Sequence, residues 1–176
     1  MLASSSPMSS HNTTSTTNSF QLTYQDKGTL GLVISYPFDW KRIVADDKAL
    51  IFLPPSKHDK FSESLVVALF HINGSISAGQ LSGKAINKYG QHYNEFPILH
   101  SKPFIFDGDP EWILLYSYTN PVAGKIFAMD IRINDGNKVY IISYSAEQPE
   151  YDTYLATIEK MINSFRMTQV DGSVTN

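Results

Sequence analysis

The stretch from Leu30 to Trp40 (LGLVISYPFDW) limits most strictly how this chain can fold. Apolar side chains recur there at every second position: Leu30, Leu32, Ile34 and Tyr36. This period of two predicts a strand with one buried face. Pro37 lacks a backbone N–H and has a fixed φ, so the strand must end there. Phe38 and Trp40 follow at once, and we expect their rings to close the end of a sheet. The stretch specifies an architecture and carries no sign of a reaction.

The composition excludes several classes of function. The 176 residues include no cysteine, which rules out disulfides, thiolate nucleophiles and cysteine-ligated zinc or iron–sulfur sites. Seventeen acidic residues against fourteen basic ones give a net charge of −3, whereas nucleic-acid binders usually carry a basic stripe. No dense cluster of Lys and Arg indicates an anionic lipid surface, and no apolar run reaches the roughly 18 residues of a membrane span.

The two ends of the chain differ in composition from the middle. Residues 1–19 are almost entirely Ser, Thr and Asn, and they offer too little apolar surface to offset the entropy of ordering them. They also lack the basic and apolar regions of a signal peptide. We expect a disordered N-terminal tail over 1–19; the alternative is a tether between a removed signal or lipid anchor and the folded part. Residues 20–168 are expected to form a single domain, and 169–176 a frayed C-terminal tail.

The first half of the chain predicts strands. Alternating or continuous apolar residues favour strands over 20–25, 30–36, 49–53 and 64–72. The run Ser64–Ile72 is apolar on both faces and should lie inside a sheet.

From Phe96 onward the pattern is that of an antiparallel meander. Strands are expected over 98–106, 112–118, 127–133 and 139–146, with turns at 107–110 and 134–137. In the strand 127–133, apolar residues alternate with Ala128, Asp130 and Arg132, which predicts one exposed face.

Two helices complete the expected elements. Ser77 and Gln80 form a capping box, and Leu81, Ala85, Tyr89 and Tyr93 follow as one apolar stripe. Gly79 and Gly83 should weaken this helix by roughly 1 kcal/mol each.

The second helix has the stronger pattern. Pro149 is expected as its first helical residue, and a wide apolar face extends to Phe165 and must lie on the sheet.

The segment Gly79–Ala85 superficially resembles a phosphate-binding loop. That motif needs four residues between its glycines and a Ser or Thr after the lysine, whereas here there are three and Ala85 follows Lys84. Nucleotide binding is therefore not expected.

Acidic residues cluster at one predicted turn. Asp107, Asp109 and Glu111 are oxygen ligands of the kind a hard cation prefers. The EF-hand spacing is absent, and turn chemistry alone explains Asp and Gly at a solvated hairpin tip, so we favour that interpretation. Asp46 and Asp47 are likewise interpreted as a loop.

The histidines do not have the spacing of a zinc site. They are His11, His58, His71, His92 and His100. His71 is interpreted as a sheet residue, and His92 lies near a helix C-terminus, where a cation is favoured. No G-x-S-x-G elbow occurs, and nothing points to a triad of distant residues. We therefore assign no catalytic residue, no cofactor and no cofactor-binding residue, and the metal ligands stay unknown.

The order of elements and several motifs resemble the PsbP-like family, the lumenal extrinsic subunit of photosystem II and its relatives. The similar stretches are Tyr36–Trp40, Ser64–Ala68, Lys138–Ala146 and the terminal helix that closes on Ser164-Phe165. The resemblance covers about residues 20–168.

This resemblance implies an α+β fold, with a central antiparallel sheet flanked by helices in an α/β/α sandwich. It also implies an exported, non-enzymatic protein that docks on partners. The same fold occurs in non-photosynthetic prokaryotes and in a eukaryotic nuclear-transport protein that binds the GTPase Ran, so function does not follow from fold. The calcium or manganese binding of some members has no assignable ligand motif here.

The expected function is that of a non-catalytic, extracytoplasmic interaction or assembly module for a membrane-associated partner. The alternative is a hydrolase-like enzyme whose site no motif reveals. We expect a monomer that is secreted or membrane-tethered, binds a protein and no nucleic acid, and contacts a membrane only through an upstream anchor.

Overall fold

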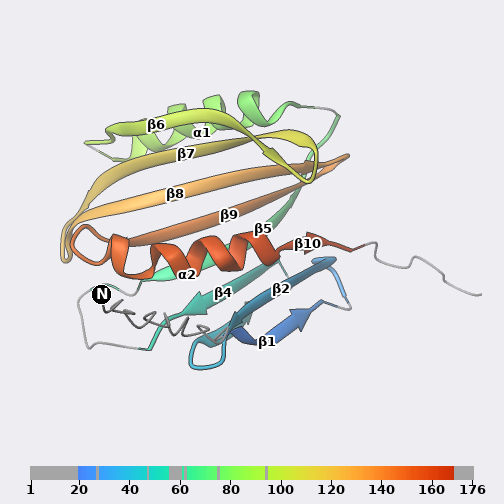
Figure 1. The fold of residues 1–176 in the computed structure, drawn as a ribbon. Coiled ribbons are helices and arrows are strands. Elements are labelled where there is room, and N and C mark those ends of the chain that lie inside the picture. The colour runs from blue at the N-terminus through green and yellow to red at the C-terminus, as the bar shows by residue number, and fades with distance from the viewer. Residues whose placement is uncertain are drawn as a thin grey trace, which may run out of the picture.

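An antiparallel sheet forms the centre of this computed structural model, which describes residues 20–26, 28–46, 48–55, 61, 63–74, 76–93 and 95–168. Seven of the described strands form this sheet (Figure 1). Their order is β3 (Lys41–Ala45), β4 (Ala49–Leu53), β5 (Ser64–His71), β9 (Lys138–Glu147), β8 (Gly124–Asp135), β7 (Asp109–Asn120) and β6 (Ile98–Phe106). The two predicted tails, His11, His58 and Asp47 lie outside the described residues.

The two helices cover opposite faces of this sheet (Figure 1). Helix α1 (Ala78–His92) packs on β7 and β8, and α2 (Tyr151–Ser164) packs on β9 and β2. A smaller sheet of β1 (Phe20–Gln25), β2 (Leu32–Pro37) and β10 (Arg166–Met167) lies on the α2 side. The α+β class and the central antiparallel sheet between helices are thus confirmed, while the small sheet was not anticipated.

The main hydrophobic core lies between the central sheet and α2. On β9, Tyr140, Ile142, Tyr144 and Ala146 are buried at alternate positions, as expected for one face of a strand. They meet the apolar stripe of α2, which includes Ile158, Met161 and Ile162, and the following Phe165. Both elements therefore bury the faces that their sequence periods predict.

The stretch Leu30–Trp40 enters this core largely as predicted. Its alternate residues Leu30, Leu32, Ile34 and Tyr36 are all buried, and β2 ends at Pro37. Trp40 is 7% exposed and meets Tyr154 of α2 edge-on, with ring centroids 5.8 Å apart.

The prediction for Phe38 was wrong, because this ring is 60% exposed. Phe38 and Asp39 form a turn closed by the Trp40 N–H, which donates to the Pro37 carbonyl at 3.2 Å. The turn directs Trp40 inward and leaves Phe38 outside.

The N-terminal cap predicted for α1 is confirmed, whereas the predicted start of α2 is wrong. The capping box is present: Gln80 N–H donates to Ser77 Oγ at 3.2 Å, and Ser77 N–H donates to Gln80 Oε1 at 3.0 Å. Pro149 is not the first residue of α2, which begins at Tyr151 after the N-cap Glu150. Pro149 instead lies in a turn closed by Glu150 N–H donating to Glu147 O, so the chain reverses once more before the helix. Strand β3 was also not predicted.

Replacing Trp40 tests how far the core depends on the closure after Pro37. Trp40→Ala removes a buried ring and should lower the free energy of unfolding by about 3–5 kcal/mol. For a chain of this size that corresponds to a fall in Tm of about 6–20 °C, measurable by thermal unfolding. Phe38→Ala is the matched control and should leave Tm almost unchanged. Equal midpoints for Trp40→Ala and the parent protein would contradict the structural role.

Candidate functional site

Strand β8 carries a charged pair that is fully buried. Asp130 is 0% exposed and Arg132 is 1% exposed. The prediction of a half-exposed strand over 127–133 was therefore wrong. The alternation does place Asp130 and Arg132 on the face opposite the main core, but α1 lies over that face.

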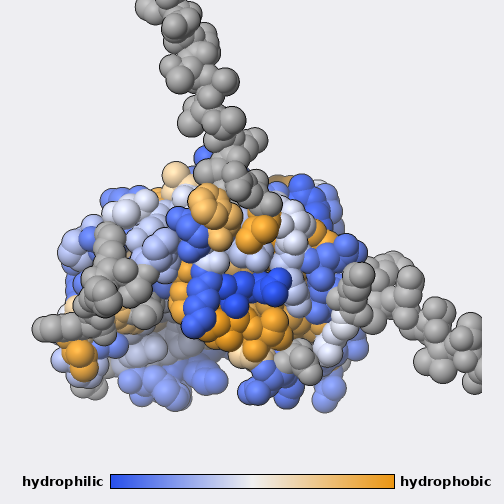
Figure 2. Space-filling view, turned by 90° about the horizontal axis from the view of Figure 1, so that it is seen from below, coloured by the Kyte–Doolittle hydropathy of each residue, from blue (hydrophilic) through white to orange (hydrophobic). Residues whose placement is uncertain are grey.

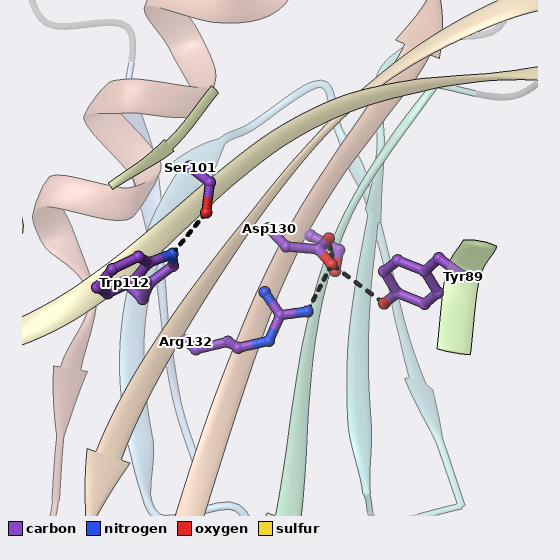
Figure 3. Close-up of polar contacts among 6 residues, drawn as sticks. Tyr89, Ser101, Trp112, Asp130 and Arg132 are labelled. Carbon is purple, nitrogen blue, oxygen red and sulfur yellow. Dashed lines mark hydrogen bonds and ion pairs between the residues drawn. The ribbon is translucent and has the colours of Figure 1, made fainter. Parts of the chain in front are cut away.

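Three side chains from three elements donate to the Asp130 carboxylate (Figure 3). Arg132 Nη2 and the Tyr89 hydroxyl each donate to Oδ2 at 3.1 Å, and Ser143 Oγ donates to Oδ1 at 2.7 Å. Tyr89 comes from α1, while Ser143 lies directly opposite Asp130 on β9. The carboxylate therefore ties the helix to two strands of the sheet.

This network is closed to a substrate. A buried ion pair carries a large desolvation cost, which strong hydrogen bonds to the remaining lone pairs can offset. Asp130 has those bonds, whereas Arg132 Nη1 has no hydrogen-bond partner among the described protein atoms. The pair therefore fixes the position of α1 and offers no accessible acid or base.

The buried position of Tyr89 beside Asp130 shifts the pKa of its hydroxyl. Burial, and then the nearby charge of Asp130, raise the pKa of Tyr89 to about 12. Burial likewise raises the pKa of Tyr118 to about 12, and the pKa of Tyr116 still further. These hydroxyls stay protonated near neutral pH, so they act as hydrogen-bond donors and not as bases.

An aromatic cluster surrounds the C-terminal half of α1. Its members are Tyr89, Tyr93, Phe96, Tyr116 and Tyr118. The rings of Tyr93 and Tyr118 stack with centroids 4.6 Å apart, and those of Phe96 and Tyr116 lie 4.9 Å apart. Such pairs add roughly 0.5–1.5 kcal/mol each beyond the area they bury.

The N-terminal half of α1 is held by different contacts. Trp112 Nε1 donates to Ser101 Oγ at 2.9 Å (Figure 3), and the Trp112 ring lies against Gly79. A Cβ at Gly79 would lie only 3.2 Å from this ring. Asn134 Nδ2 also donates to Ile76 O at 2.8 Å, just before the helix. Gly79, expected to weaken the helix, therefore permits its close approach to the sheet.

A surface groove lies beyond the end of α1. It has a volume of about 700 Å³ and is lined by His92, Tyr93, Glu95, Tyr118, Thr119, Asn120 and Pro121. His92 Nδ1 lies 2.9 Å from Lys88 O and donates to it, which leaves Nε2 for other contacts. This groove brings together one imidazole and one carboxylate.

The structure does not bring the predicted acidic cluster together. Asp107 and Gly108 form the loop of the β6–β7 hairpin and both have positive φ, whereas Glu111 is buried. Glu111 Oε1 accepts the Asn134 N–H at 3.0 Å. Within the described ranges, no three His, Asp or Glu side chains are grouped to hold a metal ion.

The other sequence candidates also stay separate. Gly79–Ala85 lies within α1, as predicted. His71 and His100 lie on β5 and β6, which are separated by three strands in the sheet order. Neither of the helices that the structure describes is long and apolar enough to cross a membrane.

Strands β3, β4, β5 and β9 present a partly exposed apolar surface on the α1 side. Residues that lie directly opposite each other on neighbouring strands share a face of the sheet. One row of such pairs crosses five strands and consists of Ile43, Ile51, Val66, Ser143 and Asp130. This register places the surface on the same side as Asp130, next to the strands that α1 covers. We call it the β4–β5 face, and its side chains are Ile43, Ile51, Leu53, Val66, Ala68, Phe70 and Ile141.

The opposite sides of β4 and β5 are covered, whereas Val44 on that side of β3 is 45% exposed. Leu50 and Phe52 of β4, and Leu65 and Val67 of β5, are 0% exposed on the α2 side. On the β4–β5 face, Phe70 is 51% exposed and the other six side chains are partly exposed. Sequence reasoning placed β5 inside the sheet but did not foresee that one apolar face would stay accessible.

No protein-family model and no curated protein matches this chain. Several solved structures do. Cyanobacterial PsbP from Synechocystis sp. PCC 6803 has a TM-score of 0.59 at 18% identity, covering 92% of this chain and 99% of its own. LpqN of Mycobacterium tuberculosis has a TM-score of 0.60 at 15% identity, covering 84% of this chain and 90% of its own. The Ran-binding protein Mog1p of Saccharomyces cerevisiae has a TM-score of 0.55 at 11% identity, covering 83% and 94%.

These likenesses establish the fold. The chain has the PsbP-like fold, as the resemblance of its motifs implied. At 11–18% identity, the similarity is one of architecture and assigns no activity.

Replacing Asp130 tests the buried network. Asp130→Asn removes the charge that Arg132 pairs with, and should cost about 3–5 kcal/mol of unfolding free energy, measured by urea denaturation. The double variant Asp130→Leu with Arg132→Met should recover most of this loss, because no buried charge is left unpaired. Equal losses for the single and the double variant would contradict a stability effect that arises from the orphaned arginine.

Glu111 provides a test by pH. Burial raises the pKa of this carboxyl above its ordinary value of 4.5. Its stabilising contribution is therefore fully present below the ordinary pKa and is lost as the pH rises through the raised pKa. Glu111→Gln keeps the oxygen acceptor but cannot ionise, so its unfolding free energy relative to the parent protein should increase as the pH rises above 4.5 and through the raised pKa. A flat difference for Glu111→Gln would contradict the assignment.

Proposed function

We propose that this chain is a non-catalytic, extracytoplasmic interaction module that docks on a protein partner. It acts as a monomer, and any link to a membrane runs through that partner or an anchor upstream of the domain. The β4–β5 face is the surface through which it docks.

This proposal rests on the difference between the polar network around Asp130 and the apolar β4–β5 face. The group of ionisable side chains around Asp130 is buried and already hydrogen-bonded. The β4–β5 face is apolar and reachable from solvent, and exposed apolar patches are characteristic of protein-binding surfaces. These two observations favour a binding role over a catalytic one.

The names of the structural neighbours support the same role. Mog1p is described as a Ran-binding protein, and LpqN as involved in cell envelope biogenesis. The first supports docking on a protein, and the second supports a place outside the cytoplasm.

Photocrosslinking in living cells tests the docking surface. Phe70 is replaced by p-benzoylphenylalanine, a photoreactive residue of similar shape, in the organism that encodes the chain. Irradiation should give a discrete protein adduct, identified by mass spectrometry. Phe38 is the matched control, because it is also an exposed phenylalanine but lies in the β2–β3 turn. No adduct from position 70, or the same adducts from both positions, would overturn the proposal.

The hydrolase alternative has its own readout. The groove containing His92 and Glu95 is the described place where an imidazole and a carboxylate line one hollow. Turnover of ester or glycoside reporter substrates that His92→Ala abolishes would replace the binding role with an enzymatic one.

A further inference from the structure

We infer that the partner presents an acidic, amphipathic helix to the β4–β5 face, lying alongside α1. This inference rests on the proposed function and names the chemistry of the segment that the face would bind.

The width of the sheet leaves room for a second helix beside α1. Neighbouring strands lie about 4.8 Å apart, so β3, β4, β5 and β9 together span about 15–20 Å. A helix with its side chains is about 10–12 Å wide. Because α1 packs on β7 and β8, one further helix fits over β3, β4, β5 and β9 without displacing it.

The floor of this surface suits the apolar stripe of a helix. Ile51 and Val66 lie directly opposite each other, as do Ala49 and Ala68. At the Phe70 end of the face there is a mostly apolar hollow of about 430 Å³, lined by Thr29, Lys48, Ala49, Ala68, Leu69, Phe70 and His71. One large apolar side chain of the partner can anchor in this hollow.

The charged side chains around the surface are mainly basic, with Glu147 as an acidic exception at one end. Strands β3, β4 and β5 and helix α1 contain no aspartate or glutamate. Lys41 is exposed on β3, two residues before Ile43, and so belongs to the same side of the sheet. On β9, Glu147 lies on this side at the end of the strand.

A second lysine borders the face at its Phe70 end. Lys48 lines the hollow there together with Ala49 and Phe70, and it is exposed. Lys41 is opposite Leu53, whereas Lys48 directly precedes Ala49, so the two lysines lie at opposite ends of the apolar floor.

Figure 2 views the molecule from the side where β1, β2 and β4 lie in Figure 1. Hydrophobic residues gather there in a continuous area, with strongly hydrophilic residues across it and around it. An apolar stripe flanked by carboxylates suits a floor that has Lys41 and Lys48 at its ends, since the carboxylates meet these lysines as the stripe covers the floor.

The same charges disfavour a second copy of this chain. Two β4–β5 faces related by a two-fold axis would bring Lys41 and Lys48 against like charges. Neither helix of the chain supplies the missing element, since α1 has no acidic residue and the apolar stripe of α2 is buried in the core.

A pair of designed peptides tests the chemistry directly. The probe is a fluorescent 18-residue helical peptide with a leucine stripe and glutamate flanks, and the control has lysine in place of every glutamate. Fluorescence anisotropy with the full-length protein should show at least about tenfold tighter binding of the glutamate peptide, an effect weakened by salt. Phe70→Ala and Lys48→Glu should each weaken this binding about threefold or more. Lys102→Glu, on edge strand β6, is the matched control and should leave it unchanged, while circular dichroism confirms that every variant is folded.

The outcomes separate this inference from the proposed function. A Phe70 adduct in cells without preference for the glutamate peptide would overturn the acidic helix and leave protein docking standing. Absence of the adduct would overturn both. Concentration-dependent dimerisation that Phe70→Ala abolishes would assign the face to a second copy. Tighter binding to vesicles of phosphatidylglycerol than to the glutamate peptide would assign it to a lipid surface, and either result would overturn the inference.

Discussion

The carboxylate of Asp130 is the point on which the α1 side of the molecule depends. A single buried charge accepts bonds from Arg132, from Ser143 on the next strand and from Tyr89 on the helix. An apolar contact could hold a helix to a sheet at several registers. Hydrogen bonds to one buried carboxylate hold it at one register, because any slip would leave a charge without partners. Gly79 and the Trp112 ring set the other end of the same helix at close range. The position of α1 then determines which strands are covered and which remain accessible.

The sequence predicted elements whose faces are chosen by hydrophobic burial. One strong local pattern was sufficient to predict each of three elements. These patterns are the alternation in Leu30–Tyr36, the capping box at Ser77 and the apolar face of α2. The errors arose where tertiary structure decides. Asp130 and Arg132 have the pattern of a solvated strand face, and only the placement of α1 turns that face into an interior. Phe38 and Trp40 are similar in hydrophobicity, and the turn at Pro37 separates them into an exposed ring and a buried one.

The candidate site was less predictable than the fold for the same reason. The paired positions of β8 and β9 bring Ser143 to Asp130, and no local motif encodes that register. The β4–β5 face was partly encoded, because the run Ser64–His71 is apolar on both sides. Such a run is characteristic of a strand covered on both faces. In this chain one of the two covers is absent from the described residues, and in the proposed function a partner supplies it.

The two edges of the central sheet have a consequence for how this protein behaves in a crowded compartment. Unpaired edge strands invite neighbouring chains to add further strands, and natural proteins discourage this with proline and with charged side chains. Edge strand β6 contains Lys102 and Pro103, and edge strand β3 begins with Lys41 and Arg42. Growth of the sheet strand by strand is therefore hindered at both ends. The chain can keep an apolar face accessible without forming fibrous aggregates, because its hydrogen-bonding edges are poor templates.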